Sequence, residues 1–478
     1  MNYRMICRVL GFIMLCLAAL LLLPLTAGLC YGQNVLNFVI TIGIAAALGF
    51  LLTRARPKNG GLFARDGFVI VGLGWIMMSL VGALPFVLSG SIPNYIDAVF
   101  ETVSGFTTTG ASVVLNVEQM PRGDLFWRLF THWIGGMGVL VFVLAVLPMS
   151  GEHSMHIMRA EVPGPTVGKL VPRARKTASI LYLIYVVMTV IETVMLKCGG
   201  MSFYDALLHS FATAGTGGFS TRAASIGAFN SLYVEMVTAT FMILFGMNFN
   251  LYFLLLLGRF KDVVKNEELH WYLGIIAAAV LAIALGITKM YGGFAVALRH
   301  AYFNVATVIS TTGFCTVDFS TWPEYCKWIL VLLMFTGACA GSTGGGLKIS
   351  RVAILAKSSR AEVRQTVHPR SICRIQLDGR RVDAGVVRAV SVFFVMYVSL
   401  LLFITFIISF DNYDLETNFT ATLSCMSNIG PGMSLVGPTG SFSIFSPLSK
   451  IVLSFAMLLG RLELYPILVL FSARTWKS

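Results

Sequence analysis

The chain has 478 residues, of which 56% are hydrophobic and only 12% carry a charge. Soluble domains carry about twice that charged fraction, so the composition excludes an ordinary soluble protein and predicts a polytopic membrane protein. The formal net charge of +13 does not indicate a nucleic-acid partner, because the basic residues lie mostly in alternate loops between apolar spans and not in patches with aromatic neighbours.

Two apolar segments open the chain and predict two spanning helices, at about residues 7–29 and 35–52. The first segment follows Arg4 and Arg8, as in a signal peptide, but it is long enough to span and has no small-residue cleavage site before a soluble domain. We therefore assign residues 1–65 to two N-terminal transmembrane helices. The loop that follows them is basic, which favours the cytoplasmic side; its basic residues are Arg54, Arg56, Lys58 and Arg65.

Residues 66–176 form the first pore repeat of the prediction. Helices are expected at 68–88 and 125–148, with a short helical insert at 94–105 between them. The insert is too short and too polar to cross a bilayer, so it must enter and turn back with its backbone facing a water-filled path. Another basic loop follows and is again expected in the cytoplasm; its basic residues are Arg159, Lys169, Arg173, Arg175 and Lys176.

The same unit recurs three times, over residues 177–268, 269–382 and 383–478. First helices are expected at 177–196, 271–289 and 386–410; inserts at 202–214, 294–309 and 415–426; second helices at 231–258, 325–356 and 448–471. Ser202, with Asp205 three residues later, resembles a capping box, so the second insert should begin as a true helix. Basic residues follow each second helix, which places both termini in the cytoplasm.

Each insert ends in a Gly-centred turn, and these turns recur about every hundred residues. Their sequences are SGFTTTGAS at 104–112, GTGGFST at 215–221, STTGF at 310–314 and SNIGPG at 427–432. We take Gly110, Gly217, Gly313 and Gly430 as equivalent. One such turn carries little information, but four turns between pairs of spanning helices predict an all-α membrane protein with four pseudo-symmetric units around one pore.

The turns are suited to a dehydrated monovalent cation, because backbone carbonyls can replace its water without a buried countercharge. Glycine permits positive φ and lets the chain approach the pore axis closely. The short helices direct their partially negative C-termini inward. Hydroxyl groups near the turns can add ligands or anchor the loops; they belong to Thr108, Thr109, Thr216, Thr311 and Thr312. Together these features predict a cation-selective constriction.

Acidic residues lie on the same side as the turns and allow two interpretations. They could raise the local cation concentration at the pore mouth. Alternatively, they are only what the positive-inside bias leaves on that side. The residues are Asp97, Glu101, Glu118, Asp124, Asp205, Asp318, Glu324, Asp411, Asp414 and Glu416.

The second helix of the third unit is interrupted between Gly337 and Lys348. The spacing of two glycines there resembles a phosphate-binding P-loop, but Leu347 stands where lysine is required and a membrane helix precedes the run. Six residues of poor helix propensity should break the helix at membrane depth, beside water or protein. This segment is a candidate gate, the alternative being a close helix contact; it comprises Gly341, Ser342, Thr343, Gly344, Gly345 and Gly346.

Arg461 lies in the apolar final helix, where a charge is costly and by default functional. Glu463 is only two residues away and lies on another helix face, so it is a poor direct partner. We expect Arg461 to face the pore axis, to contact carbonyls of residues 341–346 and to resist ion passage until the gate moves. The alternative is a structural arginine neutralised by a carboxylate elsewhere.

Six ordered motifs are similar to those of the Trk/Ktr/HKT superfamily of potassium transporters, over nearly the whole chain. They are TTTGAS, TGGFST, STTGF, NIGPG, CAGSTGGGLK and GRLELYPILVLF. The resemblance implies potassium uptake through a homodimer in the bacterial cytoplasmic (inner) membrane, with one pore per subunit. It also implies a cytoplasmic regulatory partner with nucleotide-binding RCK domains. K⁺ is then the transported ion, membrane lipid surrounds the chain, and no organic cofactor is expected in it.

The resemblance also implies which residues line the filter. Gly110 favours potassium, since members that prefer sodium often carry serine there. The filter oxygens would come from Thr108 and Thr109, Gly215 and Thr216, Thr311 and Thr312, and Asn428 and Ile429, with Gly110, Gly217, Gly313 and Gly430 beside them.

Other functions remain as alternatives. One is a Na⁺- or H⁺-coupled, or poorly selective, monovalent cation transporter. A membrane-embedded enzyme would need convergent acid/base or metal-binding residues at membrane depth, and the sequence offers only Arg461 and scattered carboxylates at loop ends. We therefore expect no enzyme activity and no catalytic residues. Inverted repeats, as in many secondary transporters, are disfavoured because all four units begin and end on the same side.

Overall fold

The computed structural model describes residues 1–55, 64–138, 174–371 and 374–476. Over these residues the regular structure is helical except for one hairpin of two short strands, β1 (Gln376–Leu377) and β2 (Arg380–Arg381). Six described helices are long and apolar enough to cross a membrane, and a sharply bent pair would make a seventh span. The predicted class, an all-α polytopic membrane protein, is confirmed.

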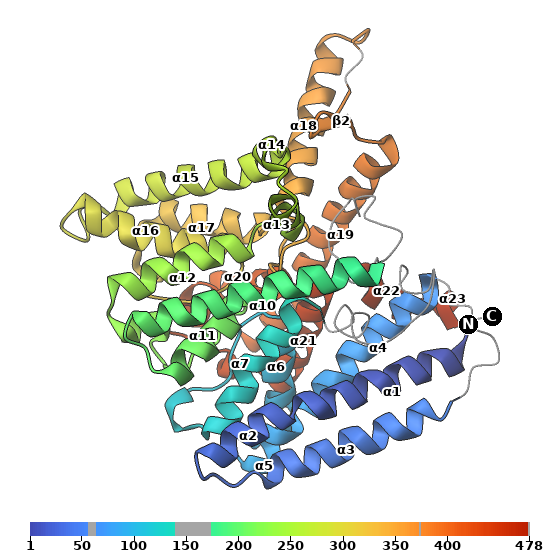
Figure 1. The fold of residues 1–478 in the computed structure, drawn as a ribbon. Helices are drawn as coiled ribbons and strands as arrows, with labels where there is room; N and C mark the ends of the chain where they lie inside the picture. The colour runs from blue at the N-terminus through green and yellow to red at the C-terminus, as the bar shows by residue number, and fades with distance from the viewer. Residues whose placement is uncertain (56–63, 139–173, 372–373, 477–478) are drawn as a thin grey trace.

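The chain begins with two packed helices at one edge of the bundle (Figure 1). Their segments are α1 (Tyr3–Leu20), α2 (Leu22–Cys30) and α3 (Leu36–Thr53). Glycines bring α1 and α3 together: a Cβ added at Gly11 would lie 2.8 Å from the carbonyl oxygen of Gly49. Small residues commonly allow such close approach between membrane helices.

The four predicted inserts form short helices within one residue of their expected bounds, and we call them pore helices. They are α6 (Tyr95–Phe106), α11 (Phe203–Ala214), α16 (Phe294–Ile309) and α20 (Leu415–Ser427). Side-chain caps begin three of them, because Asn94, Ser202 and Asp414 accept hydrogen bonds from backbone N–H groups of the first turn. The helix start predicted at Ser202 is therefore confirmed.

Each pore helix packs between the other helices of its own unit. The first helices are α4 (Ala64–Gly82) with α5 (Leu84–Ser89), α10 (Ala174–Cys198), α15 (Glu267–Ile287) and α19 (Ala384–Ile408). The second helices begin with α7 (Arg122–Gly136), α12 (Leu232–Phe245), α17 (Glu324–Thr336) and α21 (Pro447–Arg461).

The second helices also join the units into a ring. Helix α7 packs against α11 of the next unit, α12 against α16, and α17 against α20. Helix α21 then packs against α6 of the first unit. The sequence of contacts closes on itself, so the four units surround a common axis.

The second helices are interrupted more often than predicted. The expected break in the third unit is present, between α17 and α18 (Ile349–Val367). The continuous helices expected at 231–258 and 448–471 are wrong. The first divides into α12 and α13 (Phe249–Leu256), bent by 89°, and the second into α21 and α22 (Tyr465–Phe471).

Each of these two breaks has its own local backbone geometry. At the first, the Asn248 side chain accepts a hydrogen bond from the Asn250 N–H at 3.0 Å and so begins a new helix. At the second, Glu463 and Leu464 adopt φ values of 55° and 66°, which no α-helix accommodates.

Helix α7 ends at Gly136, and Met137 and Gly138 do not continue it; the rest of the expected helix, residues 139–148, lies outside the described residues. So do several basic loop residues, Arg56, Lys58, Arg159, Lys169, Arg173 and Lys477. The remaining short helices are α14 (Phe260–Val264) and α23 (Ala473–Trp476), and 3₁₀ turns occupy Val117–Gln119, Ser225–Phe229, Phe319–Thr321, Ser409–Asp411, Ser434–Val436 and Phe442–Ile444.

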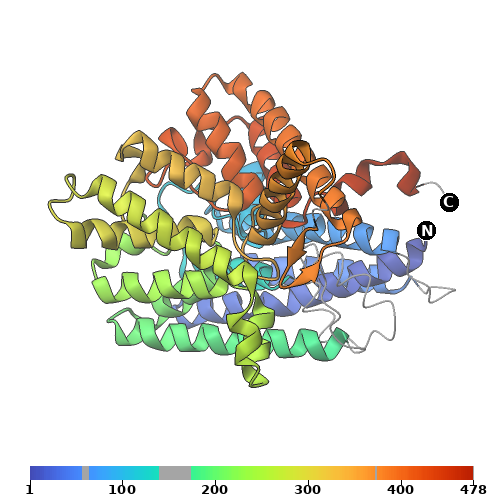
Figure 2. The same cartoon turned by 90° about the horizontal axis from the view of Figure 1, so that it is seen from above.

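The two termini lie side by side in both views (Figures 1 and 2). The Tyr3 hydroxyl donates to the Trp476 carbonyl at 3.1 Å, which joins them directly. Helix α18 and the β-hairpin project from the bundle (Figure 1).

Candidate ion pathway

The four turns after the pore helices share one backbone conformation. In each, a residue with φ between 54° and 59° precedes, by two positions, a glycine with positive φ. Positive φ is uncommon for threonine, so its fourfold recurrence indicates that the turns are built alike. The pairs are Thr108 and Gly110, Thr216 and Gly218, Thr311 and Gly313, and Asn428 and Gly430.

The structural register corrects one predicted equivalence. Gly218, not Gly217, matches the other three glycines in conformation, and Gly217 takes the position of Thr109. Gly215 was predicted to line the filter with Thr216, but in this register it matches Thr107: it caps α11, as Thr107 caps α6. The sequence alone could not decide between the adjacent Gly217 and Gly218. The end of α11 at Ala214 sets the register of the turn and identifies Gly218.

Neighbouring turns meet through a carbonyl of one and the glycine of another. A Cβ added at Gly110 would lie 2.0 Å from the Gly217 carbonyl oxygen, and one at Gly218 would lie 2.1 Å from that of Thr312. The same relation joins Gly313 to Ile429 at 2.0 Å and Gly430 to Thr109 at 2.8 Å. Equivalent carbonyls therefore link the four turns into a closed ring. At this spacing no side chain fits at the glycines.

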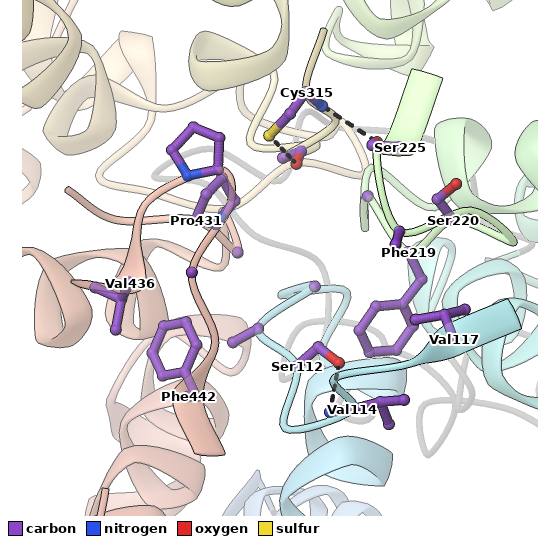
Figure 3. A pocket seen from close by; sticks show the side chains of 18 of the residues that line it. Ser112, Val114, Val117, Phe219, Ser220, Ser225, Cys315, Pro431, Val436 and Phe442 are labelled. Atoms are coloured by element: carbon purple, nitrogen blue, oxygen red, sulfur yellow. Dashed lines mark hydrogen bonds between the residues drawn. The ribbon is translucent and has the colours of Figure 1, made fainter. Parts of the chain in front are cut away.

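A cavity of about 130 Å³ lies against this ring, and all four turns line it (Figure 3). Ser112, Phe219, Cys315 and Pro431 mark the four turns around it in Figure 3. We call it the vestibule. Its charged lining residues, within the described chain, are Arg128 and Arg222; none is acidic.

The acidic residues expected near the turns mainly serve structural roles. Asp97 pairs with Lys450 at 2.7 Å, Asp124 accepts hydrogen bonds from Asn37 and Ser91, and Asp318 and Asp414 cap helical turns. Of the two interpretations drawn from the sequence, these contacts favour the one in which the carboxylates do not concentrate cations at the mouth.

A buried ion pair holds the first two turns together. Arg128 Nε lies 2.7 Å from Glu101 Oε1, and both side chains are at most 3% exposed. The same guanidinium donates to Ser112 Oγ in the first turn at 3.0 Å and to the Ser220 carbonyl in the second at 3.3 Å. It also lies 3.6 Å above the Phe219 ring. The sequence did not predict a role for Arg128, because a charged residue near the end of an expected helix is not unusual.

His132 adds a second link between the same turns. Its Nε2 accepts a hydrogen bond from the Phe219 N–H at 3.2 Å, so Nδ1 carries the proton and donates to the Gly105 carbonyl at 2.8 Å. The imidazole thus joins the end of α6 to the second turn in its neutral form.

The glycine-rich segment between α17 and α18 packs directly against the third and fourth turns. The Gly345 N–H donates to Thr311 Oγ1 at 2.7 Å. A Cβ added at Gly344 would lie 2.9 Å from the Ser310 carbonyl oxygen, and one at Gly345 would lie 2.2 Å from that of Ser427. Only a backbone without side chains can approach the turns this closely.

The interruptions of two neighbouring helices satisfy each other's backbone groups. The Cys339 N–H donates to the Gly246 carbonyl at 3.0 Å, and the Phe249 N–H donates to the Gly341 carbonyl at 3.0 Å. Backbone groups freed at membrane depth need such internal partners. This reciprocal bonding explains why α12 breaks beside the glycine-rich segment.

Arg461 ends α21 and contacts three other parts of the chain. Its Nη1 donates to the Thr343 carbonyl at 2.6 Å and to Thr108 Oγ1 at 3.3 Å. Its Nη2 donates to the last carbonyls of α7, at Gly135 and Gly136, at 2.5 and 2.7 Å. The expected contact with a carbonyl of residues 341–346 is confirmed.

Two buried cationic side chains near residues 341–346 were not predicted from the sequence. Lys348 is 2% exposed, and its ammonium donates to the Gly344 carbonyl. Arg351 pairs with Glu463, so that carboxylate bonds to another arginine instead of Arg461. Three cationic side chains thus surround the glycine-rich segment.

Comparison with known proteins places the chain among cation transporters. Residues 32–478 match the TrkH family model, described as a cation transport protein. The Trk system potassium uptake protein TrkH of Escherichia coli (strain K12) is 36% identical, and that of Halomonas elongata is 34% identical; both alignments cover the full length of both chains. The crystal structure of the potassium transporter TrkH from Vibrio parahaemolyticus matches with a TM-score of 0.89 at 32% identity, over 100% of each chain.

Proposed function

The chain belongs to the TrkH family of cation transport proteins, and we propose that it takes up potassium ions across the bacterial cytoplasmic membrane. One observation carries the proposal: four equivalent turns form a closed ring beside a vestibule that all four of them line. A ring of backbone carbonyls is the arrangement by which proteins replace the hydration shell of K⁺.

The filter would be formed by two successive residues in each turn. Positive φ at the first residue and a glycine two positions later set the course of the backbone in all four turns. The register of the structure supports Thr108 and Thr109, Thr216 and Gly217, Thr311 and Thr312, and Asn428 and Ile429 as the residues that bind K⁺, with Gly110, Gly218, Gly313 and Gly430 beside them.

The glycine-rich segment would gate the pathway together with Arg461. The segment bonds to the third turn through the Gly345 N–H and to Arg461 through the Thr343 carbonyl. A guanidinium beside the first turn opposes cations by its charge. Opening therefore requires Arg461 and residues 341–346 to separate and withdraw from the ring.

The wider assembly follows from the resemblance. We propose a homodimer in which each subunit has its own pore, and a regulatory partner with nucleotide-binding RCK domains on the cytoplasmic side. The proximity of the two termini supports their common location on that side.

The test is uptake of ⁸⁶Rb⁺ into proteoliposomes that contain the purified full-length chain, in competition with external K⁺, Na⁺ or Li⁺. We expect K⁺ to block uptake at far lower concentrations than Na⁺. Equal block by K⁺ and Na⁺ would instead support a poorly selective cation transporter.

A variant that lacks Gly344–Gly346 separates a closed gate from a wrong function. We expect it to carry more flux than the intact chain in the same vesicles. Absence of uptake by both proteins, each correctly folded, would contradict the proposal.

A further inference from the structure

Two arginines line the vestibule, and their charges differ in how far they are compensated. Arg128 is buried and paired with Glu101, so its charge is compensated. Arg222 is different: its side chain is 43% exposed, and its Nη2 lies 3.8 Å from Asp205 Oδ2. Of the charged side chains that line the vestibule in the described chain, Arg222 is thus the more loosely compensated.

Asp205 is a weak counterion because its carboxylate serves other groups. Oδ1 accepts a hydrogen bond from Thr221 Oγ1 at 2.7 Å, and Oδ2 accepts one from Ser202 Oγ at 2.8 Å. These bonds fix the carboxylate at the start of α11. Arg222 therefore cannot draw the Asp205 carboxylate closer without loss of one of these two hydrogen bonds.

The backbone at Arg222 is also fixed beside the vestibule. Its N–H donates to Ser220 Oγ at 3.0 Å, and its carbonyl accepts from the Ser225 N–H at 3.1 Å. Ser220 and Ser225 themselves line the vestibule, as Figure 3 shows. The guanidinium can rotate about its side-chain bonds but cannot leave the mouth of the pathway.

We propose that Arg222 is a tethered cation that slows the entry of K⁺ and so raises the external K⁺ concentration needed for half-maximal uptake. The inference rests on the proposed function of the ring as a cation filter. Like charges repel, and a charge at the rim of a binding site acts mainly on the rate of association and its salt dependence. Arg222 thus determines apparent affinity and leaves the filter geometry unchanged.

The experiment measures initial ⁸⁶Rb⁺ uptake against external Rb⁺ concentration, in proteoliposomes at low and high ionic strength set with an impermeant organic cation. For Arg222→Gln we expect KM to fall about threefold at ~10 mM ionic strength, and by less than about 1.5-fold at ~300 mM, where the charge is screened. The maximal rate should stay unchanged. Arg222→Lys, which keeps the charge, should behave as the wild type.

Arg122→Gln is the matched control. Arg122 begins α7 and is exposed, and it does not line the vestibule. Its replacement removes the same charge from the chain and should leave KM unchanged at both ionic strengths.

Two outcomes would overturn the inference: an unchanged KM for Arg222→Gln at low ionic strength, or an equal fall for Arg122→Gln. If wild-type vesicles take up Rb⁺ with block by K⁺, either outcome rejects only the role of Arg222. If they take up none, the proposed function itself is in question.

Discussion

Arg128 and Glu101 show how a single side-chain pair can hold neighbouring turns of the ring in place. Their ion pair is buried, and its guanidinium bonds to the first and second turns at once. Loss of one partner would leave the other charge buried and unpaired, which typically costs about 3–5 kcal/mol. The same loss would free the two turns to move apart.

For Arg128→Met we therefore predict a lower melting temperature and a lower K⁺/Na⁺ preference in Rb⁺ competition. The control is Arg299→Met, which breaks an ion pair of similar length with Glu235: Arg299 Nε in α16 lies 2.6 Å from Glu235 Oε2 in α12. That pair is more exposed and does not contact the turns, so stability should fall less and ion preference should not change. An unaltered preference in folded Arg128→Met protein would show that the pair serves stability alone.

The ring glycines give a second prediction at this scale. Gly110→Ser and Gly218→Ser should each lower the K⁺/Na⁺ preference, because the new Cβ would lie 2.0 or 2.1 Å from a carbonyl oxygen of the next turn. Gly200→Ser is the control: Gly200 also has positive φ, of 95°, but a Cβ there meets nothing within 4 Å. Its strain of about 1–3 kcal/mol should appear only in stability. Equal ion preference in all three variants would contradict the assignment of the ring.

Some residues of the candidate site could be predicted from the sequence and others could not, for physical reasons. Thr–Gly pairs identified Gly110 and Gly313, and the NIG run identified Gly430, whereas two adjacent glycines in the TGG run concealed Gly218. Arg128 and His132 escaped because their roles depend on partners in other turns. Arg461 could be recognised because a charge within an apolar helix is itself a signal.

At the scale of elements, the glycine-rich segment is held by bonds from several helices. Arg461 donates to the segment, to α7 and to the first turn. We predict that Arg461→Ala raises basal Rb⁺ flux, since it removes both the charge and the bond to Thr343. Arg461→Lys should give an intermediate flux because it keeps the charge without the planar fork. A reduced flux from folded Arg461→Ala protein would argue against the gate.

Glu268 stabilises the two ends of the same segment. Its Oε1 accepts hydrogen bonds from the Ala340 N–H at 2.7 Å and the Ser350 N–H at 3.2 Å. For Glu268→Ala we predict faster amide hydrogen exchange over residues 338–350, because each unsatisfied buried N–H costs about 1–3 kcal/mol. Glu267→Ala is the control, since that neighbour bonds instead to Lys357 and the Asp378 N–H. Equal exchange in the two variants would disprove the anchoring role.

Helix breaks were predictable only where several weak residues follow each other. Six successive residues of low helix propensity predicted the break in the third unit. A single glycine such as Gly246 destabilises a helix by only about 1 kcal/mol and is usually tolerated. The break after Arg461 has neither glycine nor proline at its centre. Both missed breaks are stabilised by partners distant in sequence, which no local pattern contains.

At the scale of the whole molecule, each unit covers the pore helix of the following unit. Every second helix packs on the pore helix of the following unit, and every turn meets a carbonyl of another turn. Spanning segments and inserts could be located from hydropathy and length alone. Closure of the ring could not be predicted in this way, because it depends on which elements of different units contact each other.

The closure between the last and first units bears on the synthesis of the protein. Helix α21 packs on α6, and Lys450 reaches Asp97 across 353 residues of chain. A ribosome releases the end of α21 only after nearly all of the polypeptide has been inserted. During translation the ring consequently lacks its final quarter, so the ring of turns cannot close in an unfinished chain. Truncated products would leave the face of α6 that packs on α21 without its covering helix.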